Sequence, residues 1–577
     1  MIDHDVLIIG GGLAGTRAAV EVARTNPGLS IGLIAKTHPI RSHSVAAQGG
    51  MAATLKNADP SDSWEAHAFD TVKGGDYLAD QDAVAILTQE APDVVIDLEH
   101  MGVLFSRRED GRIAQRAFGG HSHNRTCYAA DKTGHAILHE LVNNLQRHNV
   151  TLYDEWYVME LIFEENQAKG VVAYRILDGA IEVFRAKAVM FATGGYGRVY
   201  NTTSNDYASC GDGLAMTVAA GLPVEDLEFV QFHPTGLYPV GVLISEAVRG
   251  EGAYLINAAG DRFMAQYAPS RMELAPRDIT SRAINYEVRA GRGIHPKDGS
   301  AGGPVAYLDL RHMGRAKIMD RIPFCWEEAH VHLGIDAAVT PIPIRPTVHY
   351  SMGGIPVNVD GRVRRNASEL TGGFFSAGET ACVSVHGANR LGSNSLLECV
   401  VYGKRTGFAM ANYVEGRSLP EVDSDRYIKA AETQLQSVLD NPGTYRVNDI
   451  RQAYQDCMTE HCGIFRTQEI MEAGLVKLKE IRAQAERVKL DDRSRTWNSE
   501  LVEALELRSL MRVGEIILTS ALNRRESRGS HFREDCPDRD DEKFLQHTIA
   551  SYSPEAGVTI NYMPVVVNQF EPKERKY

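Results

Sequence analysis

The stretch Asp5-Val-Leu-Ile-Ile-Gly10-Gly-Gly12-Leu-Ala-Gly15 decides the fold of this chain. Its apolar half predicts a short buried strand, and its glycines open a helix that extends to about Arg24. After a turn at Asn26-Pro-Gly28, residues 29 to 36 predict a second strand. A strand, a Gly-x-Gly-x-x-Gly turn, a helix and a strand in this order are the fingerprint of a dinucleotide-binding βαβ unit.

Each glycine of the fingerprint has a distinct physical role. Gly10 permits the tight turn, Gly12 lets the backbone approach a pyrophosphate, and Gly15 lets the helix pack on the strand. The helix N-terminus at Leu13 and Ala14 supplies unpaired N–H groups for phosphates. The acid that usually holds the ribose after the second strand is replaced by Ala35-Lys36-Thr37. This replacement disfavours NAD and leaves FAD open, with another residue needed for the ribose.

The next stretch, residues 40 to 50, brings a histidine to the place expected for the ring end of the cofactor. His43 is followed by Ser44, Gln48, Gly49 and Gly50, and most side chains around it are tiny. Small side chains let the backbone approach a flat, bulky group. We therefore expect the cofactor ring to lie against this stretch.

Further segments predict later passes of the chain around the same cofactor. They are an apolar strand ending in Ala192-Thr193-Gly194, the turn Cys210-Gly-Asp212-Gly, and the strand Gly373-Phe-Phe-Ser-Ala-Gly-Glu379. Glu379 is a candidate for the missing ribose carboxylate. A solvated loop glutamate is the alternative at this position.

The 577 residues are enough for several domains. We expect an α/β protein with a Rossmann-like FAD-binding domain in two parts, residues 1–240 and 351–415. A turn-rich α+β capping domain, residues 241–350, is inserted between them. A helical domain at 416–530 and a small C-terminal domain at 531–577, with a β-like stretch at 562–567, complete the chain.

Charge and composition exclude several classes of partner. The net charge of −14 argues against direct binding of nucleic acid or of an anionic bilayer. No apolar run approaches the ~18 residues of a membrane span, and the N-terminus lacks a signal segment. The 8 cysteines form no C-x-x-C, which indicates reduced thiols in a cytosolic compartment and places any iron–sulfur chemistry on a partner.

Five polar motifs combine histidine or arginine with Gly and Pro turns. They are Phe229-Val-Gln-Phe-His-Pro-Thr235, Ser245-Glu-Ala-Val-Arg-Gly-Glu-Gly252, Met272-Glu-Leu-Ala-Pro-Arg-Asp278, Arg345-Pro-Thr-Val-His-Tyr-Ser-Met-Gly-Gly354 and His386-Gly-Ala-Asn-Arg-Leu-Gly-Ser-Asn-Ser395. Arginine binds carboxylates bidentately and histidine adds directed donors, so together these motifs favour a site for a small dianion. Metal hydrolysis is the rival for the pairs His121/His123 and His330/His332, but no H-E-x-x-H occurs and we predict no metal ligands.

With these motifs, the chain closely resembles the flavoprotein subunit of succinate dehydrogenase/fumarate reductase over essentially its full length. The matching residues are Arg41-Ser-His-Ser-Val-Ala-Ala-Gln48, the motifs at His233, Arg249, Arg277, His349 and Arg390, and Glu526-Ser-Arg-Gly-Ser-His531 with Arg539-Asp-Asp-Glu542. The resemblance implies an enzyme that interconverts succinate and fumarate. It also implies electron transfer to an iron–sulfur subunit and, indirectly, to membrane anchor subunits, on the inner, cytoplasmic face of a membrane.

The resemblance also assigns roles residue by residue. It makes His43 the covalent attachment point of FAD and Arg277 the residue that exchanges a proton with substrate, with Glu246 and Arg249 leading that proton to solvent. The substrate carboxylates would be held by His233, Ser245, His349 and Arg390, and FAD would be contacted by Asp212, Glu379, Ser395 and Leu396.

Two alternatives stay open from the sequence. The segment Phe118-Gly-Gly-His-Ser-His-Asn-Arg125 is similar to L-aspartate oxidase, a related flavoenzyme that lacks the linking histidine. A non-catalytic flavin-binding protein is the alternative from another class, and retention of Arg277, Glu246 and the carboxylate-binding residues argues against it. Gln48 favours succinate oxidation, because many fumarate reductases carry Glu there, but the direction stays open. So does a cation near Met352-Gly353-Gly354.

Overall fold

The structure is a computed structural model that describes residues 1–295 and 303–576. Its centre is a mixed sheet with the strand order β16-β17-β8-β9-β1-β2-β6, in which β7 also pairs with β8. The strands are β1 (Ile2–Ile9), β2 (Ile31–Ala35), β6 (Val150–Asp154), β7 (Trp156–Glu164), β8 (Gln167–Arg175), β9 (Ile181–Phe191), β16 (Arg362–Arg364) and β17 (Leu370–Ser376). Strands β6, β2, β1, β9 and β17 run parallel to their neighbours in this series, so their carboxyl ends share one edge.

The predicted βαβ unit is confirmed as β1, α1 (Leu13–Thr25) and β2. Val6, Leu7 and Ile8 are fully buried, as expected for a parallel strand covered on both faces. Gly10 has φ of +118°, and a Cβ there would lie 2.1 Å from the Ala192 carbonyl oxygen. A Cβ on Gly15 would lie 2.0 Å from the Gly10 oxygen, so helix and strand meet backbone to backbone at this point.

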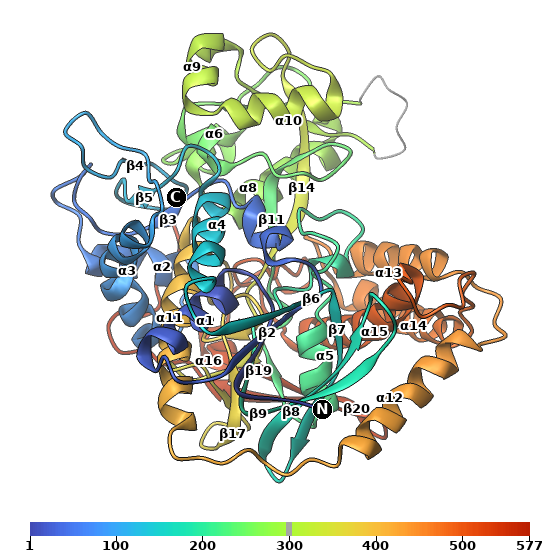
Figure 1. The fold of residues 1–577 in the computed structure, drawn as a ribbon. Coiled ribbons are helices and arrows are strands. Elements are labelled where there is room, and N and C mark those ends of the chain that lie inside the picture. The colour runs from blue at the N-terminus through green and yellow to red at the C-terminus, as the bar shows by residue number, and fades with distance from the viewer. Residues whose placement is uncertain (296–302, 577) are drawn as a thin grey trace.

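An antiparallel sheet in the order β11-β14-β13-β12 forms a second part with its own core. This part appears in green and yellow-green at the top of Figure 1, above the large sheet. Its core includes Leu255, Leu308 and Ile344. Its elements are β11 (Val230–Leu237), α6 (Glu246–Gly250), β12 (Tyr254–Ile256), α7 (Met264–Tyr267), α8 (Arg277–Glu287), β13 (Ala306–Asp309), α9 (Arg315–Arg321), α10 (Pro323–Leu333) and β14 (Ile342–Ser351).

Most buried residues of the helices of the second half belong to the core of the large sheet, and Tyr427 and Ala431 of α12 pack on the same sheet in a small separate cluster. Tyr454 and Leu510, for example, belong to the same buried cluster as Val6 and Phe374. These helices are α11 (Asn394–Val414), α12 (Ser424–Leu439), α13 (Val447–His461), α14 (Gln468–Ala485) and α15 (Ser499–Asn523). The remaining helices are α2 (Trp64–Gly74), α3 (Gln81–Met101), α4 (Thr133–Leu145), α5 (Asp212–Ala219) and α16 (Asp541–Phe544).

The last strand begins and ends earlier in the structure than the β-like stretch predicted at 562–567. Strand β20 (Gly557–Pro564) ends at the proline, and it pairs with β19 (Gln546–Ser553), which in turn pairs with β10 (Val224–Glu225). Proline has no N–H for a further ladder bond, which explains the end of the strand. Smaller pairings join β3 (Met51–Ala52), β4 (Gln115–Arg116) and β5 (Thr126–Cys127), and join β15 (Ile355–Pro356) to β18 (Ala381–Cys382).

Candidate active site

A cavity of about 620 Å³ lies at the carboxyl edge of the parallel strands and extends to the second core. Ligands of open α/β sheets bind at this edge. Nearly all residues predicted for the site line the cavity: Gly10, Gly12, Leu13, Ala14, Lys36, Thr37, His43, Ser44, Gln48, Gly49, Gly50, Ala192, Thr193, Gly194, Asp212, His233, Ser245, Glu246, Arg277, His349, Glu379, Arg390, Ser395 and Leu396. Gly15 and Arg249 do not line it: Gly15 lies in the helix–strand contact, and Arg249 lies behind Glu246.

The nucleotide end of the cavity fits a dinucleotide such as FAD. The N-cap residue of α1, Gly12, has no side chain to cap the helix, so the backbone N–H groups that follow Leu13 in the first turn are left for a phosphate. The Ser44 hydroxyl accepts a hydrogen bond from the Leu13 N–H at 3.1 Å and ties the ring-end stretch to this helix. Glu379 is buried among these residues, and burial raises the pKa of its carboxyl to about 7. A buried carboxylate that accepts the Ser351 N–H at 2.9 Å has further acceptor capacity for a ribose hydroxyl.

Lys36, where the usual ribose acid is missing, joins the FAD-binding part to helix α15. Its Nζ lies 2.7 Å from Asp212 Oδ2 and 2.6 Å from Glu506 Oε1. Burial alone would lower the pKa of Lys36, but the two carboxylates raise it well above its usual value. Lys36 therefore stays charged and neutralises Asp212. Its second partner, Glu506, lies 470 residues from Lys36 in the chain, so the sequence could not predict that pair.

His43 sits in a short 3₁₀ turn, His43–Ala46, at the ring end of the cavity. Asn205 Nδ2 donates to His43 Nε2 at 3.0 Å and to the backbone oxygen of His349 at 3.0 Å. Burial lowers the pKa of His43, so its imidazole is neutral at physiological pH and keeps a lone pair. Asn205 was missed from the sequence, because nothing in its local pattern marks it.

The end of the cavity away from the nucleotide, on the same side as His43, presents donors that have no acceptor among the described residues. His233 Nδ1 accepts the Thr235 N–H at 3.3 Å, which leaves the proton of the neutral ring on Nε2. That Nε2 and Arg390 Nε are buried and have no hydrogen-bond partner among the described residues. An unpaired buried donor is costly, so this end fits an anionic ligand with several acceptor oxygens.

His349 and Ser245 complete the same end of the cavity. The ring of His349 lies 5.0 Å from that of His233, centroid to centroid, and its Nδ1 lies 2.8 Å from Ser204 Oγ. Ser245 caps helix α6, and its Oγ accepts the Ala247 N–H at 3.2 Å. Burial, followed by the charge of Arg277, lowers the pKa of Arg390 to about 9.

Arg277 contacts both a carboxylate and an amide at this end of the cavity. Its Nε donates to Glu246 Oε2 at 2.7 Å, and its Nη1 donates to Gln231 Oε1 at 3.0 Å. Burial alone would raise the pKa of Glu246, but Arg277 and Arg249 lower it, so the carboxylate is charged at neutral pH. Arg249 Nη2 lies 3.7 Å from the same Glu246 oxygen, and Arg249 lines a separate cavity with Glu251 and Lys317.

Gln231 is a second site residue that the sequence analysis missed. Its Nε2 donates to Asn389 Oδ1 at 2.9 Å and to the Arg390 oxygen at 2.8 Å, while its Oε1 faces Arg277. The amide thus links Arg277 to the loop that carries Arg390. Gln231 and His233 are alternate residues of β11 and share a face, so the period-2 rule applied to this motif would have found it.

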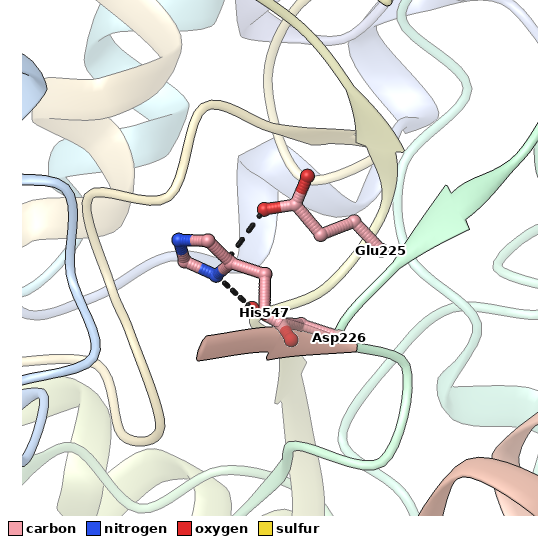
Figure 2. A group of neighbouring side chains, drawn as sticks. All are labelled: Glu225, Asp226 and His547. Atoms are coloured by element: carbon pink, nitrogen blue, oxygen red, sulfur yellow. Dashed lines mark hydrogen bonds and ion pairs between the residues drawn. The ribbon is translucent and has the colours of Figure 1, made fainter. Parts of the chain in front are cut away.

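The histidines His121, His123, His330 and His332, which the sequence offered as possible metal ligands, do not line the main cavity. His121 Nε2 bonds the Gly392 oxygen at 2.8 Å, and His330 and His332 lie on helix α10. A different buried group, Glu225, Asp226 and His547, has its ligand atoms close together (Figure 2). Both ring nitrogens of His547 face carboxylates, Nδ1 at 2.7 Å from Asp226 and Nε2 at 3.2 Å from Asp80. Burial would lower the pKa of His547, but these acids raise it well above its usual value, so the group is a buried ion pair between β10 and β19.

Comparisons with known proteins agree with this geometry. Residues 5–396 match the FAD binding domain family, and residues 451–577 match the fumarate reductase flavoprotein C-terminal family. The succinate dehydrogenase flavoprotein subunit of Rickettsia bellii is 44% identical over 576 residues, which cover 98% of this chain and 95% of that one. The fumarate reductase flavoprotein subunit of Mycobacterium tuberculosis is 41% identical and covers 100% of this chain and 99% of its own length.

Solved structures give the same result. A variant of the FrdA subunit of E. coli quinol fumarate reductase superimposes with a TM-score of 0.94 at 38% identity, covering 100% of this chain and 98% of that one. The Mycobacterium smegmatis Sdh1 structure has a TM-score of 0.84 at 33% identity, and the match covers 99% of this chain and 95% of that one. The chain therefore belongs to the family of succinate dehydrogenase and fumarate reductase flavoprotein subunits, and it is an FAD-dependent oxidoreductase of that family.

Proposed function

We propose that this chain is the catalytic flavoprotein that oxidises succinate to fumarate, or runs the reverse reaction, with proton transfer through Arg277. The observation that carries the proposal is the pairing of Arg277 with Glu246 at 2.7 Å beside the unpaired donors His233 Nε2 and Arg390 Nε. A dicarboxylate supplies acceptors for those donors. A proton carrier is then in place at the same end of the cavity.

The chemistry divides between cofactor and protein. FAD, held by the glycine-rich turn and the residues at the nucleotide end of the cavity, would supply the hydride acceptor. His233, Ser245, His349 and Arg390 hold the two carboxylates and fix the substrate. Arg277 exchanges the proton of the neighbouring carbon, and because an arginine is normally protonated it acts as base only transiently. Glu246, which contacts both Arg277 and Arg249, relays that proton toward the second cavity.

We further propose that FAD is bonded covalently to His43. The support is the position of His43 in the cavity wall and its neutral imidazole, because an uncharged ring keeps a lone pair, here on Nε2 where Asn205 donates, and such a lone pair is the nucleophile that the bond requires. L-aspartate oxidase is the runner-up enzyme and lacks the linking histidine. A non-catalytic flavin-binding protein has no need of a buried Arg277–Glu246 pair.

The partners follow from the same proposal. Electrons pass to an iron–sulfur subunit and then to membrane anchor subunits, which hold this chain at the cytoplasmic, inner face of a membrane. Among the described residues no helix combines the length and the apolar character needed to cross a bilayer. For the direction, Gln48 favours oxidation, and its Nε2 donates to the Leu243 oxygen at 3.0 Å. Relatives named for either direction are similarly close.

Turnover with an artificial electron acceptor tests the proposed function. The FAD-loaded chain is expected to reduce a dye with succinate and not with L-aspartate, because Glu246, the acid beside Arg277, is already paired with two arginines and is not available to an α-ammonium group. Reduced flavin should also be reoxidised by fumarate. Faster turnover of L-aspartate than of succinate would instead identify the runner-up.

Binding of a dicarboxylate should become tighter as the pH falls from about 8 to 6. Burial and then the charge of Arg277 hold the pKa values of His233 and His349 well below the usual value, so both rings are neutral in the free protein. A bound dianion raises these pKa values, and binding linked to proton uptake strengthens with acidity, by at most about tenfold per pH unit and per proton.

The measurement is the dissociation constant of malonate, a non-reacting dicarboxylate, across this pH range. His349→Gln should bind more weakly and with a shallower pH dependence than the wild type. An equal slope in the wild type, His349→Gln and His233→Gln would show that neither ring takes up the proton.

A further inference from the structure

A segment that follows the last strand runs from the sheet β10-β19-β20 toward the helix that begins with Arg277. This segment, Val565–Lys576, contains no helix or strand, and we call it the strap. Gln81, at the start of α3, holds its first half: Oε1 accepts the N–H groups of Asn568, Gln569 and Phe570 at 3.2, 2.7 and 2.9 Å. Gln81 Nε2 also donates to the Phe570 oxygen at 2.8 Å. The course of the strap is therefore fixed by a buried side chain well before its last residues.

The last part of the strap carries an arginine that joins two regions of the fold. Arg575 Nη1 lies 2.9 Å from Asp278 Oδ2 and 3.4 Å from Asp76 Oδ2. Asp76 follows helix α2 of the FAD-binding part, whereas Asp278 belongs to helix α8 of the second core. One guanidinium thus connects both sides of the boundary between the two cores.

The contact between Arg575 and Asp278 lies next to Arg277. Asp278 is the residue after Arg277, and both lie in the first turn of α8, so neither backbone moves without the other. The Asp278 side chain is 0% exposed and that of Arg575 is 9% exposed, so water screens their attraction weakly. Arg282 Nη2 also reaches Asp278, at 3.1 Å, from within the same helix. Its Nη1 donates to the Gly529 oxygen at 2.8 Å, and the Gly529 N–H donates to Asp76, so Arg282 gives α8 a second, indirect contact with Asp76, whereas Arg575 contacts both carboxylates directly.

The residues that hold the substrate carboxylates come from other elements. His233 lies on β11, His349 on β14 and Arg390 in the loop before α11. A small displacement of the first turn of α8 would therefore misplace the proton carrier and leave most of the dicarboxylate contacts in place. Misplacement of a reacting group lowers kcat far more than it changes substrate binding.

We propose that Arg575 is a positioning residue for Arg277: through Asp278 and Asp76, the strap holds the first turn of α8 in register with the FAD-binding part. This inference rests on the proposed function, since it concerns the same proton transfer. Arg575 itself touches neither substrate nor cofactor.

The test compares Arg575→Ala with the wild type, both as full chains loaded with FAD, in succinate turnover per bound FAD. We expect kcat to fall about tenfold and KM for succinate to change by less than about twofold. The solvent deuterium isotope effect on kcat should increase, because proton transfer becomes the slow step. Arg575→Lys should recover part of kcat, since an ammonium keeps one of the ion pairs.

Lys576→Ala is the matched control, because its side chain is 78% exposed and pairs only locally with Glu574 at 2.9 Å. It should leave kcat and the isotope effect unchanged. Asp278→Asn, which keeps the shape of the side chain and removes its charge, should reproduce the effect of Arg575→Ala even if that variant folds poorly. Variants with lower thermal stability but wild-type kcat per FAD and a wild-type isotope effect would refute the positioning role. A wild type without any dicarboxylate turnover would refute the proposed function instead.

Discussion

Arg277→Ala and Arg277→Lys are expected to retain bound FAD and to lose succinate turnover by a factor on the order of 10²–10⁴, the usual contribution of a positioned proton carrier. The side chain of Arg277 is 6% exposed and is oriented by Glu246 on one side and by Gln231 on the other. Lysine is a single point charge and cannot keep both contacts of the planar guanidinium. The cofactor end of the cavity is formed by other residues, which is why FAD binding should survive.

The measurement is kcat per bound FAD, with flavin content taken from absorbance. Arg289→Ala is the matched control, because Arg289 follows the same helix but its side chain is 51% exposed and pairs with Glu534. The control should retain wild-type turnover. Turnover close to that of the wild type in either Arg277 variant would show that another group carries the proton.

His43→Ser is expected to abolish covalent flavin attachment. After denaturation and electrophoresis, the wild-type band should fluoresce as flavin does, and the His43→Ser band should be dark although the native variant still binds FAD. Serine has no imidazole lone pair to form the bond, whereas the glycine-rich turn and the N-terminus of α1 remain available to hold the nucleotide.

His135→Ser provides the control for this experiment, because His135 lines the same cavity on helix α4. Its band should fluoresce as strongly as that of the wild type. A dark band from wild-type protein that is fully loaded with FAD would refute the covalent bond and would favour L-aspartate oxidase as the function.

Local sequence patterns predicted the parts of this molecule that depend on short-range geometry. The run from Asp5 to Gly15 specified strand, turn and helix, because buried β-branched residues and a glycine at φ of +118° act within a few residues of one another. The strand before Ala192 and the helical character expected for residues 416–530 followed from the same kind of local pattern. The resemblance, and not periodicity, supplied the roles of His43 and Arg277.

Other features could not be predicted because they join residues far apart in the chain. Asn205 contacts His43 from 162 residues away, and Gln231 reaches Asn389 from 158 residues away. Arg249, which belongs to the same motif as Glu246, turned out to lie outside the main cavity. The apolar run Val565–Val567 continued the β pattern beyond Pro564, but the structure uses it to begin the strap.

The sequence by itself determined a dinucleotide-binding α/β unit, the family to which the chain is similar and the residue types of a dianion site. Only the tertiary structure decided which donors are left without partners, which carboxylate orients Arg277, and that Arg575 reaches Asp278 across 297 residues. The physical reason is that backbone conformation and hydrophobic period are set by near neighbours, whereas the charge, burial and hydrogen bonding of a side chain depend on whatever distant segment packs against it.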